Sequence, residues 1–328
     1  MKKLTKKYSV QLAGLLLLLA LLPVSCIKDD YAPKGTATVT MTFTTRAISN
    51  STTRATGDLL DNEQMKTLRV IVARSSNSEI LYNLKYEIQP DQTEKTITFS
   101  ELTVNKNGED FDFYAIANEE GVGYTDINWE NVSVTDLQSM SLQSGFLTDA
   151  NDASTNTRIP QTAYRKIKVT PQAGGGIQTE TMTLDFAVVK VRLTINNTSS
   201  GDQYVNDINL SGVNMASTPL FANGTLSDEK GGKLNLDNMS IAAGGSATVY
   251  AYFFENQNSE GYTLTASWKK EQTLLLQTGS DDSKQTIKEI PRGTELNINI
   301  TLNATSEPNF NIEVVPWTEV EVDVPPFN

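Results

Sequence analysis

From about Lys34 onward, apolar and polar residues alternate in short segments separated by Gly, Asn, Asp and Pro. The clearest example is Thr36–Thr45, in which Val39, Met41 and Phe43 alternate with threonines. This period of two is typical of a β-strand with one buried face. The same criteria predict further strands at Leu68–Ala73, Thr96–Phe99, Phe111–Ala117, Lys166–Thr170, Val188–Ile195, Ala247–Phe254, Tyr262–Trp268 and Leu296–Leu302.

Helical patterns are few and short. We expect one helix at Asp58–Lys66 and another at Thr135–Met140, with Thr135 or Asp136 near its N-terminal cap. Many strands at this spacing favour antiparallel β-sandwiches over a parallel sheet with crossover helices. The sequence therefore predicts a mainly β protein.

A glycine-rich break at Ala173–Gly176 lies near the middle of the chain, and the strand expected after it, Thr181–Leu193, is apolar enough to open a second core. We therefore place the boundary near residue 180, with an N-terminal sandwich at 36–180 and a C-terminal sandwich at 181–328. Each part has about the size of one such domain. The polar stretch Thr148–Thr157 is predicted to be an exposed loop.

The N-terminus has the pattern of an export signal. Residues 1–25 contain four lysines, then the apolar run Leu12–Leu22, then small residues, as in a secretory signal peptide. The run ends at Cys26, the only cysteine, and Leu22–Cys26 resembles a bacterial lipobox, which implies a lipid on the Cys26 thiol. The alternative is a signal peptide followed by a chance cysteine.

The residues after Cys26 are expected to be a lipidated tether, residues 26–35. Within it, Ile27–Asp30 resembles the signal that directs Bacteroidetes lipoproteins to the outside of the outer membrane. These features predict attachment to the outer membrane through the lipid on Cys26 and exposure at the cell surface. Removing the signal peptide takes away four lysines and no acidic residue, so the mature chain is more acidic than the precursor.

Composition excludes several kinds of chemistry. The 328 residues include no histidine and one cysteine, which excludes Ser-His-Asp and Cys-His catalytic pairs and Cys/His zinc sites. The net charge of -12 argues against nucleic-acid binding, which needs a basic surface. Asp149, Asn151 and Asp152 lack the following glycine and glutamate of a calcium loop. We therefore expect no catalytic residues, no metal and no cofactor.

Two groups of side chains resemble functional sites but are expected to be structural. Paired carboxylates can cleave glycosidic bonds when they face each other across a substrate, but Asp110 and Asp112 share one strand face and are expected to be a solvated strand end. Tyr124, Trp129 and Trp268 could stack on sugars, although burial in a core is the more common fate of such residues.

An ordered series of segments resembles the Bacteroidales fimbrillins, over nearly the whole chain. The segments are the lipobox, Thr45–Ala47, Thr53–Ala55, Asp112–Asn118, Arg158–Ala163, Asp185–Val191, Tyr252–Asn256, Ile290–Gly293 and Val315–Trp317. Two departures from the family pattern are Gln161, where Met is usual, and Asp185, where basic residues are common.

This resemblance implies two transthyretin-like β-sandwich domains and a role as a stalk or tip subunit of a type V fimbria. It also implies that an arginine-specific protease cuts after Arg46 or Arg54, and that a strand of another subunit then fills the vacated place. The alternative is that Arg46 and Arg54 are ordinary solvated arginines in a polar loop.

The residues themselves suit strand exchange. Thr36–Thr45 directly precedes Arg46, and burial of Val39, Met41 and Phe43 would stabilise the precursor by about 5 to 8 kcal/mol. A sandwich that loses such a strand exposes an apolar groove and unpaired backbone groups.

The replacement strand is sought near the C-terminus, at residues 311–324. Its acidic end places Val320, Val322 and Val324 on one face, with carboxylates on the other, before two prolines stop the pattern. The alternative is that this segment is simply the last strand of its own sandwich.

The sequence is compatible with three roles. The first is a polymerising fimbrial subunit that serves adhesion, with other fimbrial subunits, an arginine-specific protease and a host or bacterial surface ligand as partners. The second is a surface glycan-binding lipoprotein, and the third is a fimbrial anchor that stays lipidated and uncut. An enzyme is the least favoured class, because the residues for it are missing.

Overall fold

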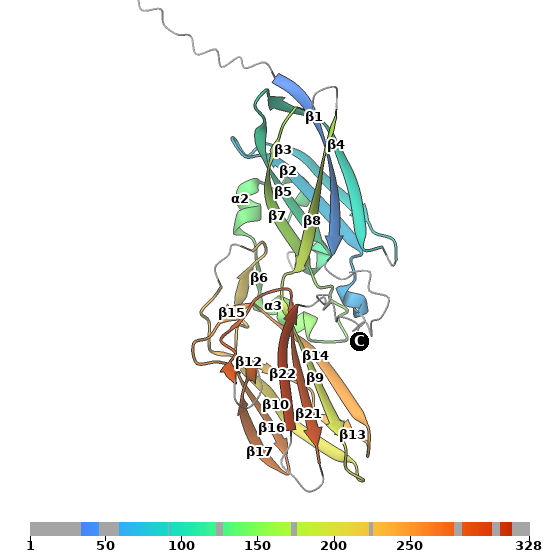
Figure 1. Cartoon of the computed structure of the whole chain (residues 1–328), viewed down its shortest axis with the longest axis vertical. Helices are drawn as coiled ribbons and strands as arrows, with labels where there is room; N and C mark the ends of the chain where they lie inside the picture. The colour runs from blue at the N-terminus through green and yellow to red at the C-terminus, as the bar shows by residue number, and fades with distance from the viewer. Residues whose placement is uncertain are drawn as a thin grey trace, which may run out of the picture.

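A computed structural model of the chain describes residues 34–45, 59–90, 92–122, 127–171, 176–222, 226–278, 284–303 and 309–316. They form two β-sandwiches placed end to end, with few and short helices (Figure 1), so the predicted mainly β class is confirmed. In the described ranges, no helix is both long enough and apolar enough to cross a membrane. The predicted signal peptide, Cys26, Arg46, Arg54, Tyr124, Val320, Val322 and Val324 lie outside the described residues.

The first sandwich consists of two layers that meet at one end. One layer contains β8 (Ile177–Phe186), β1 (Lys34–Thr45) and β4 (Glu94–Asn105), in that order. The other contains β3 (Ile80–Glu87), β2 (Thr67–Arg74), β5 (Glu109–Ala117) and β7 (Gln161–Val169). β7 and β8 pair only at Gln161 with Phe186 and Thr162 with Asp185, and the layers separate beyond these pairs.

The position of β1 follows from its alternating sequence. Val39, Met41 and Phe43 are fully buried between the two layers, where Phe99 of β4 also contacts Phe113 of β5 edge to face. β1 is the central strand of its layer, parallel to β8 and antiparallel to β4. The first core therefore includes β1 as one of its main contributors.

The second sandwich also has two layers. The first contains β14 (Ser246–Phe253), β9 (Val189–Asn197), β21 (Thr294–Leu302) and β22 (Asn309–Pro316). The second contains β12 (Gly232–Asn235), β10 (Gln203–Val213), β16 (Thr263–Trp268) and β17 (Lys270–Leu275), with β13 (Met239–Ile241) paired to β10. β9 is antiparallel to β14 and parallel to β21, so it occupies the same place in its layer as β1 does in the first sandwich.

Short elements fill the junction between the sandwiches. They are η1 (Asp61–Glu63), η2 (Glu119–Val122), η3 (Trp129–Asn131), α2 (Val134–Ser139), β6 (Ser141–Gln143), α3 (Ser144–Ala150) and β11 (Ser217–Pro219). β6 pairs with β11, and an apolar cluster that includes Tyr114, Phe146 and Phe254 joins both halves of the chain. Two small pairs, β15 (Asn256–Gln257) with β20 (Glu289–Ile290) and β18 (Gln277–Thr278) with β19 (Gln285–Thr286), complete the fold.

The nine strands expected from alternation all coincide with strands of the structure. The helix expected at Asp58–Lys66 is wrong: only the single turn η1 forms in the described part, because the chain is extended at Leu60 and Gln64 on either side of it. The second expected helix is α2, which begins one residue earlier than expected. Its cap is Ser133, whose hydroxyl accepts a hydrogen bond from the Asp136 amide.

Two expectations about segment limits need correction. The stretch Thr148–Thr157 is not wholly a loop, because its first residues belong to α3. Residue 181, the expected start of the second domain, falls inside β8, whose Met182 and Leu184 pack in the first core. The single strand expected at Thr181–Leu193 is instead parts of two strands, β8 and β9, which belong to different sandwiches. The glycine-rich break therefore lies between two strands of the first sandwich, and the second sandwich begins with β9.

The packing of β1 predicts that substitutions on its two faces differ strongly in their effect on the free energy of unfolding. Phe43→Ala should lower the free energy of unfolding by about 3–5 kcal/mol, because it leaves a cavity in the first core. The neighbouring Thr44→Ala, on the outward face, should change it by no more than about 0.5 kcal/mol. Urea unfolding of the two variants measures this; equal losses would contradict the burial of β1.

Candidate functional site

The candidate site is the space between β4 and β8 that β1 fills, which we call the β1 slot. On one side, Val39 lies opposite Phe99 and Met41 opposite Ile97 of β4. On the other side, Phe43 lies opposite Met182 of β8. β1 thus completes two backbone ladders and one apolar core at the same time.

The outward face of the β1 slot is formed by threonines. The hydroxyls of Thr40 and Thr98 are 3.0 Å apart, and so are those of Thr42 and Thr96. The register also sets Thr179 and Thr181 of β8 beside the same two β1 residues. Threonine pairs directly opposite each other stabilise adjacent strands, so this face adds to the fit of β1.

The chain after the undescribed residues 46–58 is held at the junction by contacts that do not involve β1. The Ile159 amide donates to the Asn62 carbonyl at 2.8 Å. The Gln161 side-chain amide donates to the Glu63 carbonyl at 2.9 Å. The Lys66 amide donates to Oδ1 of Asn118 at 2.9 Å. The segment that separates β1 from the rest of the chain therefore has a fixed downstream end.

Glu63 is the centre of a buried ionic cluster in this junction. Its carboxylate is fully buried and lies 2.8 Å from the Lys190 ammonium of β9. It accepts hydrogen bonds from the Tyr252 hydroxyl at 2.7 Å and from the Leu60 amide at 3.0 Å. Burial and the nearby Glu63 charge raise the pKa of Tyr252 far above its usual value. Glu63 therefore connects η1 to two strands of the second sandwich.

Glu295 of β21 is the second carboxylate beside Lys190, at 3.7 Å. Burial raises the pKa of Glu295, although Lys190 and Arg192 act in the opposite direction. Two carboxylates therefore share one buried ammonium. Removing one partner of such a buried ion pair is strongly destabilising, because it leaves an uncompensated buried charge.

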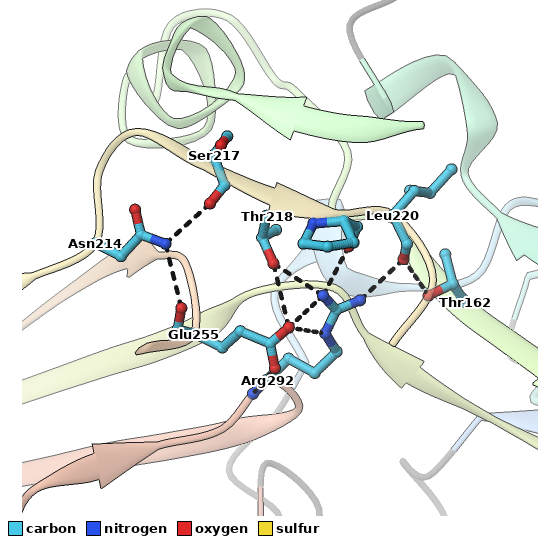
Figure 2. A network of polar contacts seen from close by, with 8 residues as sticks. Thr162, Asn214, Ser217, Thr218, Leu220, Glu255 and Arg292 are labelled. Atoms are coloured by element: carbon cyan, nitrogen blue, oxygen red, sulfur yellow. Dashed lines mark hydrogen bonds and ion pairs between the residues drawn. The ribbon is translucent and has the colours of Figure 1, made fainter. Parts of the chain in front are cut away.

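A second polar network, around Arg292, ties the two sandwiches together (Figure 2). The Arg292 guanidinium is paired with the Glu255 carboxylate. It also donates to the Leu220 carbonyl at 2.9 Å, and the Thr162 hydroxyl of β7 donates to the same carbonyl at 2.8 Å. Thr218 of β11 accepts a further hydrogen bond from Arg292, at 2.9 Å. β11 is thereby fixed between the first and second sandwiches.

The expected solvated strand end is correct for Asp110 and wrong for Asp112. Asp110 is exposed, whereas Asp112 is buried and accepts a hydrogen bond from the Tyr164 hydroxyl at 2.9 Å. Burial, with the hydrogen bond to Asp112, raises the pKa of Tyr164 to about 12. Asp112 is therefore engaged with a neighbouring strand. In the ranges that the structure covers, no group of three His, Cys, Asp or Glu residues is placed to hold a metal ion.

The aromatic residues considered for sugar stacking are engaged within the protein where they are described. Trp268 is buried and donates to the Gln203 side chain at 2.8 Å. Trp129 is half-buried, with the Arg69 guanidinium 5.6 Å from its ring centre. A cavity of about 350 Å³ lies between η3 and α2 and is lined by Ile127, Asn128, Asn131, Val132, Asp136, Ser139 and Met140. That lining contains no aromatic side chain.

The structure brings together only part of the residues chosen from the sequence. Val39, Met41 and Phe43 share the β1 slot. The first part of the expected donor region, up to Pro316, forms β22 and pairs with β21 in its own sandwich. The junction residues Glu63, Glu255 and Arg292 were not predicted as site residues, although Glu255 and Arg292 lie in the segments Tyr252–Asn256 and Ile290–Gly293 that carry the family resemblance. Lys190 did carry a signal, since it is a lone charge within the apolar run Val188–Val191.

The fold and the β1 slot define a two-sandwich β protein in which an N-terminal strand is the central strand of one layer. No protein-family model and no curated protein matches the chain. Solved structures do match it over most of its length.

The tip fimbrial protein Mfa3 from Porphyromonas gingivalis, with a C-terminal truncation, matches with a TM-score of 0.58 and 13% identity, over 86% of this chain and 100% of that chain. A fimbrilin (FimA) from P. gingivalis W83 matches with a TM-score of 0.52 and 12% identity, over 86% and 98%. A candidate cell adhesion protein from Parabacteroides distasonis matches with a TM-score of 0.52 and 11% identity, over 87% and 98%. The resemblance to fimbrillins is thus confirmed for the fold.

The Arg292 network predicts that removing the Glu255 carboxylate strongly destabilises the protein. Glu255→Ala should lower the free energy of unfolding by about 3–5 kcal/mol, because it leaves a buried guanidinium without its counter-charge. Exposed Glu260→Ala is the matched control and should be nearly neutral. Denaturant unfolding followed by circular dichroism measures both; a loss below about 1 kcal/mol for Glu255→Ala would show that the network does not tie the sandwiches together.

Proposed function

We propose that this chain is a structural subunit of a fimbria at the cell surface, which polymerises when a strand of another subunit replaces β1. The observation that carries the proposal is the place of β1: a buried central strand, followed directly by a polar segment that contains Arg46 and Arg54. The fold shared with a tip fimbrial protein and a fimbrilin supports the same role.

Loss of β1 would leave a strong binding site for another strand. Val39, Met41 and Phe43 are fully buried, and at about 1.5–3 kcal/mol for each such side chain their removal costs about 5 to 8 kcal/mol. The backbone groups of β4 and β8 that face β1 would also lose their ladder partners. Such an open edge over an apolar groove is the site at which β-augmentation occurs.

The order of segments along the chain supports the proposed export and processing. Lipidation of Cys26 carries the precursor to the outer membrane, and an arginine-specific protease then cuts after Arg46 or Arg54. Because Cys26 precedes β1, a single cut separates the body of the subunit from both the lipid and β1. The downstream end of the cut segment stays fixed, since Asn62 and Glu63 are bonded to the first sandwich.

The donated strand is proposed to come from the C-terminal region. β22 ends at Pro316 in its own sandwich, and the alternating segment with Val320, Val322 and Val324 follows it. These valines would enter the open slot of a neighbouring subunit. The role is structural and adhesive rather than enzymatic, and the fibre presents the subunit to a host or bacterial surface ligand.

Processing gives the direct test of this function. The double variant Arg46→Ala, Arg54→Ala should remain at the cell surface at its precursor mass and be absent from fibres, because β1 cannot leave. The unaltered protein in fibres should begin at Ala47 or Ala55 by mass spectrometry. The exposed Lys106→Ala, a basic residue elsewhere on the first sandwich, should polymerise normally.

Two outcomes would contradict this function. Undiminished polymer in the double variant would exclude processing at these arginines. A mature protein that retains acylated Cys26 would favour an uncut fimbrial anchor or a monomeric glycan-binding lipoprotein.

A further inference from the structure

The β1 slot is selective, and its chemistry indicates which strand can replace β1. We propose that the replacement comes from a different kind of subunit and not from a second copy of this chain. The inference rests on the strand-exchange function proposed above and names the partner for it. Three properties of the slot support the inference: the size of its pockets, the charge of its rim and its length. The rim is the outward face of the slot, formed by the threonines of β4 and β8.

The pockets of the β1 slot increase in size from Ala37 to Phe43. Going toward the junction, they hold Ala37, Val39, Met41 and Phe43, all of them buried, and the same face ends with the buried Thr45. The acidic C-terminal segment of a second copy would offer three identical valines in either direction of insertion. Valines in the pockets of Met41 and Phe43 would leave voids in a close-packed core, which is costly.

The rim of the slot suits hydroxyls and not carboxylates. Thr40 and Thr42 pair with Thr98 and Thr96 at 3.0 Å, and Glu94 lies opposite Thr44. The one cation in the described residues of β4 and β8 is Lys95, which alternates with the rim residues and shares the face of Ile97.

A second copy would bring Glu319, Glu321 and Asp323 to this rim. None of these carboxylates would meet an opposite charge on the two flanking strands, and one would come near Glu94. Like charges on facing strands are destabilising, whereas threonine pairs are stabilising. The rim therefore disfavours the chain's own acidic segment.

The slot is also longer than that segment. β1 has 12 residues and pairs with β4 from Lys34 to Thr44 across one irregularity, between Ala37 and Val39. After β22 ends at Pro316, the chain reaches Pro325 and Pro326 within nine residues. Proline has no backbone N–H to donate to a ladder. A second copy would therefore leave part of β4 and β8 unpaired.

The fitting strand has a defined chemistry. Its apolar residues increase in size from small to aromatic in the direction of β1, its other face carries Ser or Thr, and it runs for about ten residues without proline. The acidic, valine-only segment of this chain suits another slot, with smaller pockets and basic residues at its rim. The subunit is thus placed between unlike neighbours in a mixed fibre.

A peptide competition on the full mature chain, cut in residues 46–58 by an arginine-specific protease, tests this. The probes are a copy of residues 34–45, a copy of residues 317–326, and two altered copies of residues 34–45. One altered copy carries Met41→Val and Phe43→Val, and the other carries Thr40→Glu and Thr42→Glu. Native mass spectrometry and fluorescence anisotropy measure the exchange and the affinity.

The copy of residues 34–45 should bind at least about 10-fold more tightly than the copy of residues 317–326, with both altered copies weaker than the unaltered one. Equal or tighter binding of the 317–326 peptide would overturn the inference while leaving strand exchange intact. Equal binding of all four probes would also overturn it. A cut protein that keeps its own β1 and binds no peptide would instead overturn the strand-exchange function.

Discussion

The first sandwich depends on β1 being paired on both sides. β1 joins β4 and β8, which lie in the same layer but do not pair with each other, and it fills the core with Val39, Met41 and Phe43. Its loss would therefore break two ladders and open the core in one step. Because one strand makes both kinds of interaction, its removal would leave an apolar groove and unpaired backbone groups at the same place.

The second sandwich has the same arrangement, but its corresponding strand, β9, cannot be released by a cut. β9 takes the same place as β1, antiparallel to one neighbour and parallel to the other. However, β9 follows β8 after only the two buried residues Ala187 and Val188, which leave no accessible segment to cut. The polar segment with Arg46 and Arg54 therefore distinguishes β1 from its counterpart.

The polar contacts of the junction connect the two sandwiches without involving β1. Glu63 bonds to Lys190 and Tyr252 of the second sandwich, and Arg292 links Glu255 to the backbone of β11. These contacts fix η1 and the junction independently of β1. In the proposed function, β1 is therefore exchanged while these contacts between the two sandwiches remain.

Local sequence patterns predicted many strands of this protein and which face of β1 is buried. The alternation in Thr36–Thr45 predicts both the strand and its buried face, since the period of two is a property of the strand itself. The neighbours of β1 could not be derived in this way, because pairing with β8 joins segments far apart in the sequence.

The buried polar contacts were missed for the same reason. Glu63 and Lys190 are 127 residues apart in the sequence, and Glu255 and Arg292 are 37 apart. Asp112 looks solvent-facing in the sequence because Tyr164, which covers it, lies on another strand. The processing and donor residues were chosen from the resemblance and from their position along the chain, and they stay predictions.

Amide hydrogen exchange tests the central claim, that β1 is a separable part of the first core, most directly. Exchange is compared in the intact chain and in the chain cut within residues 46–58 and freed of residues 34–45. The account predicts that β4 and β8 lose protection while β9 and β21 keep theirs. Unchanged protection of β4 and β8, or loss of protection throughout both sandwiches, would contradict it.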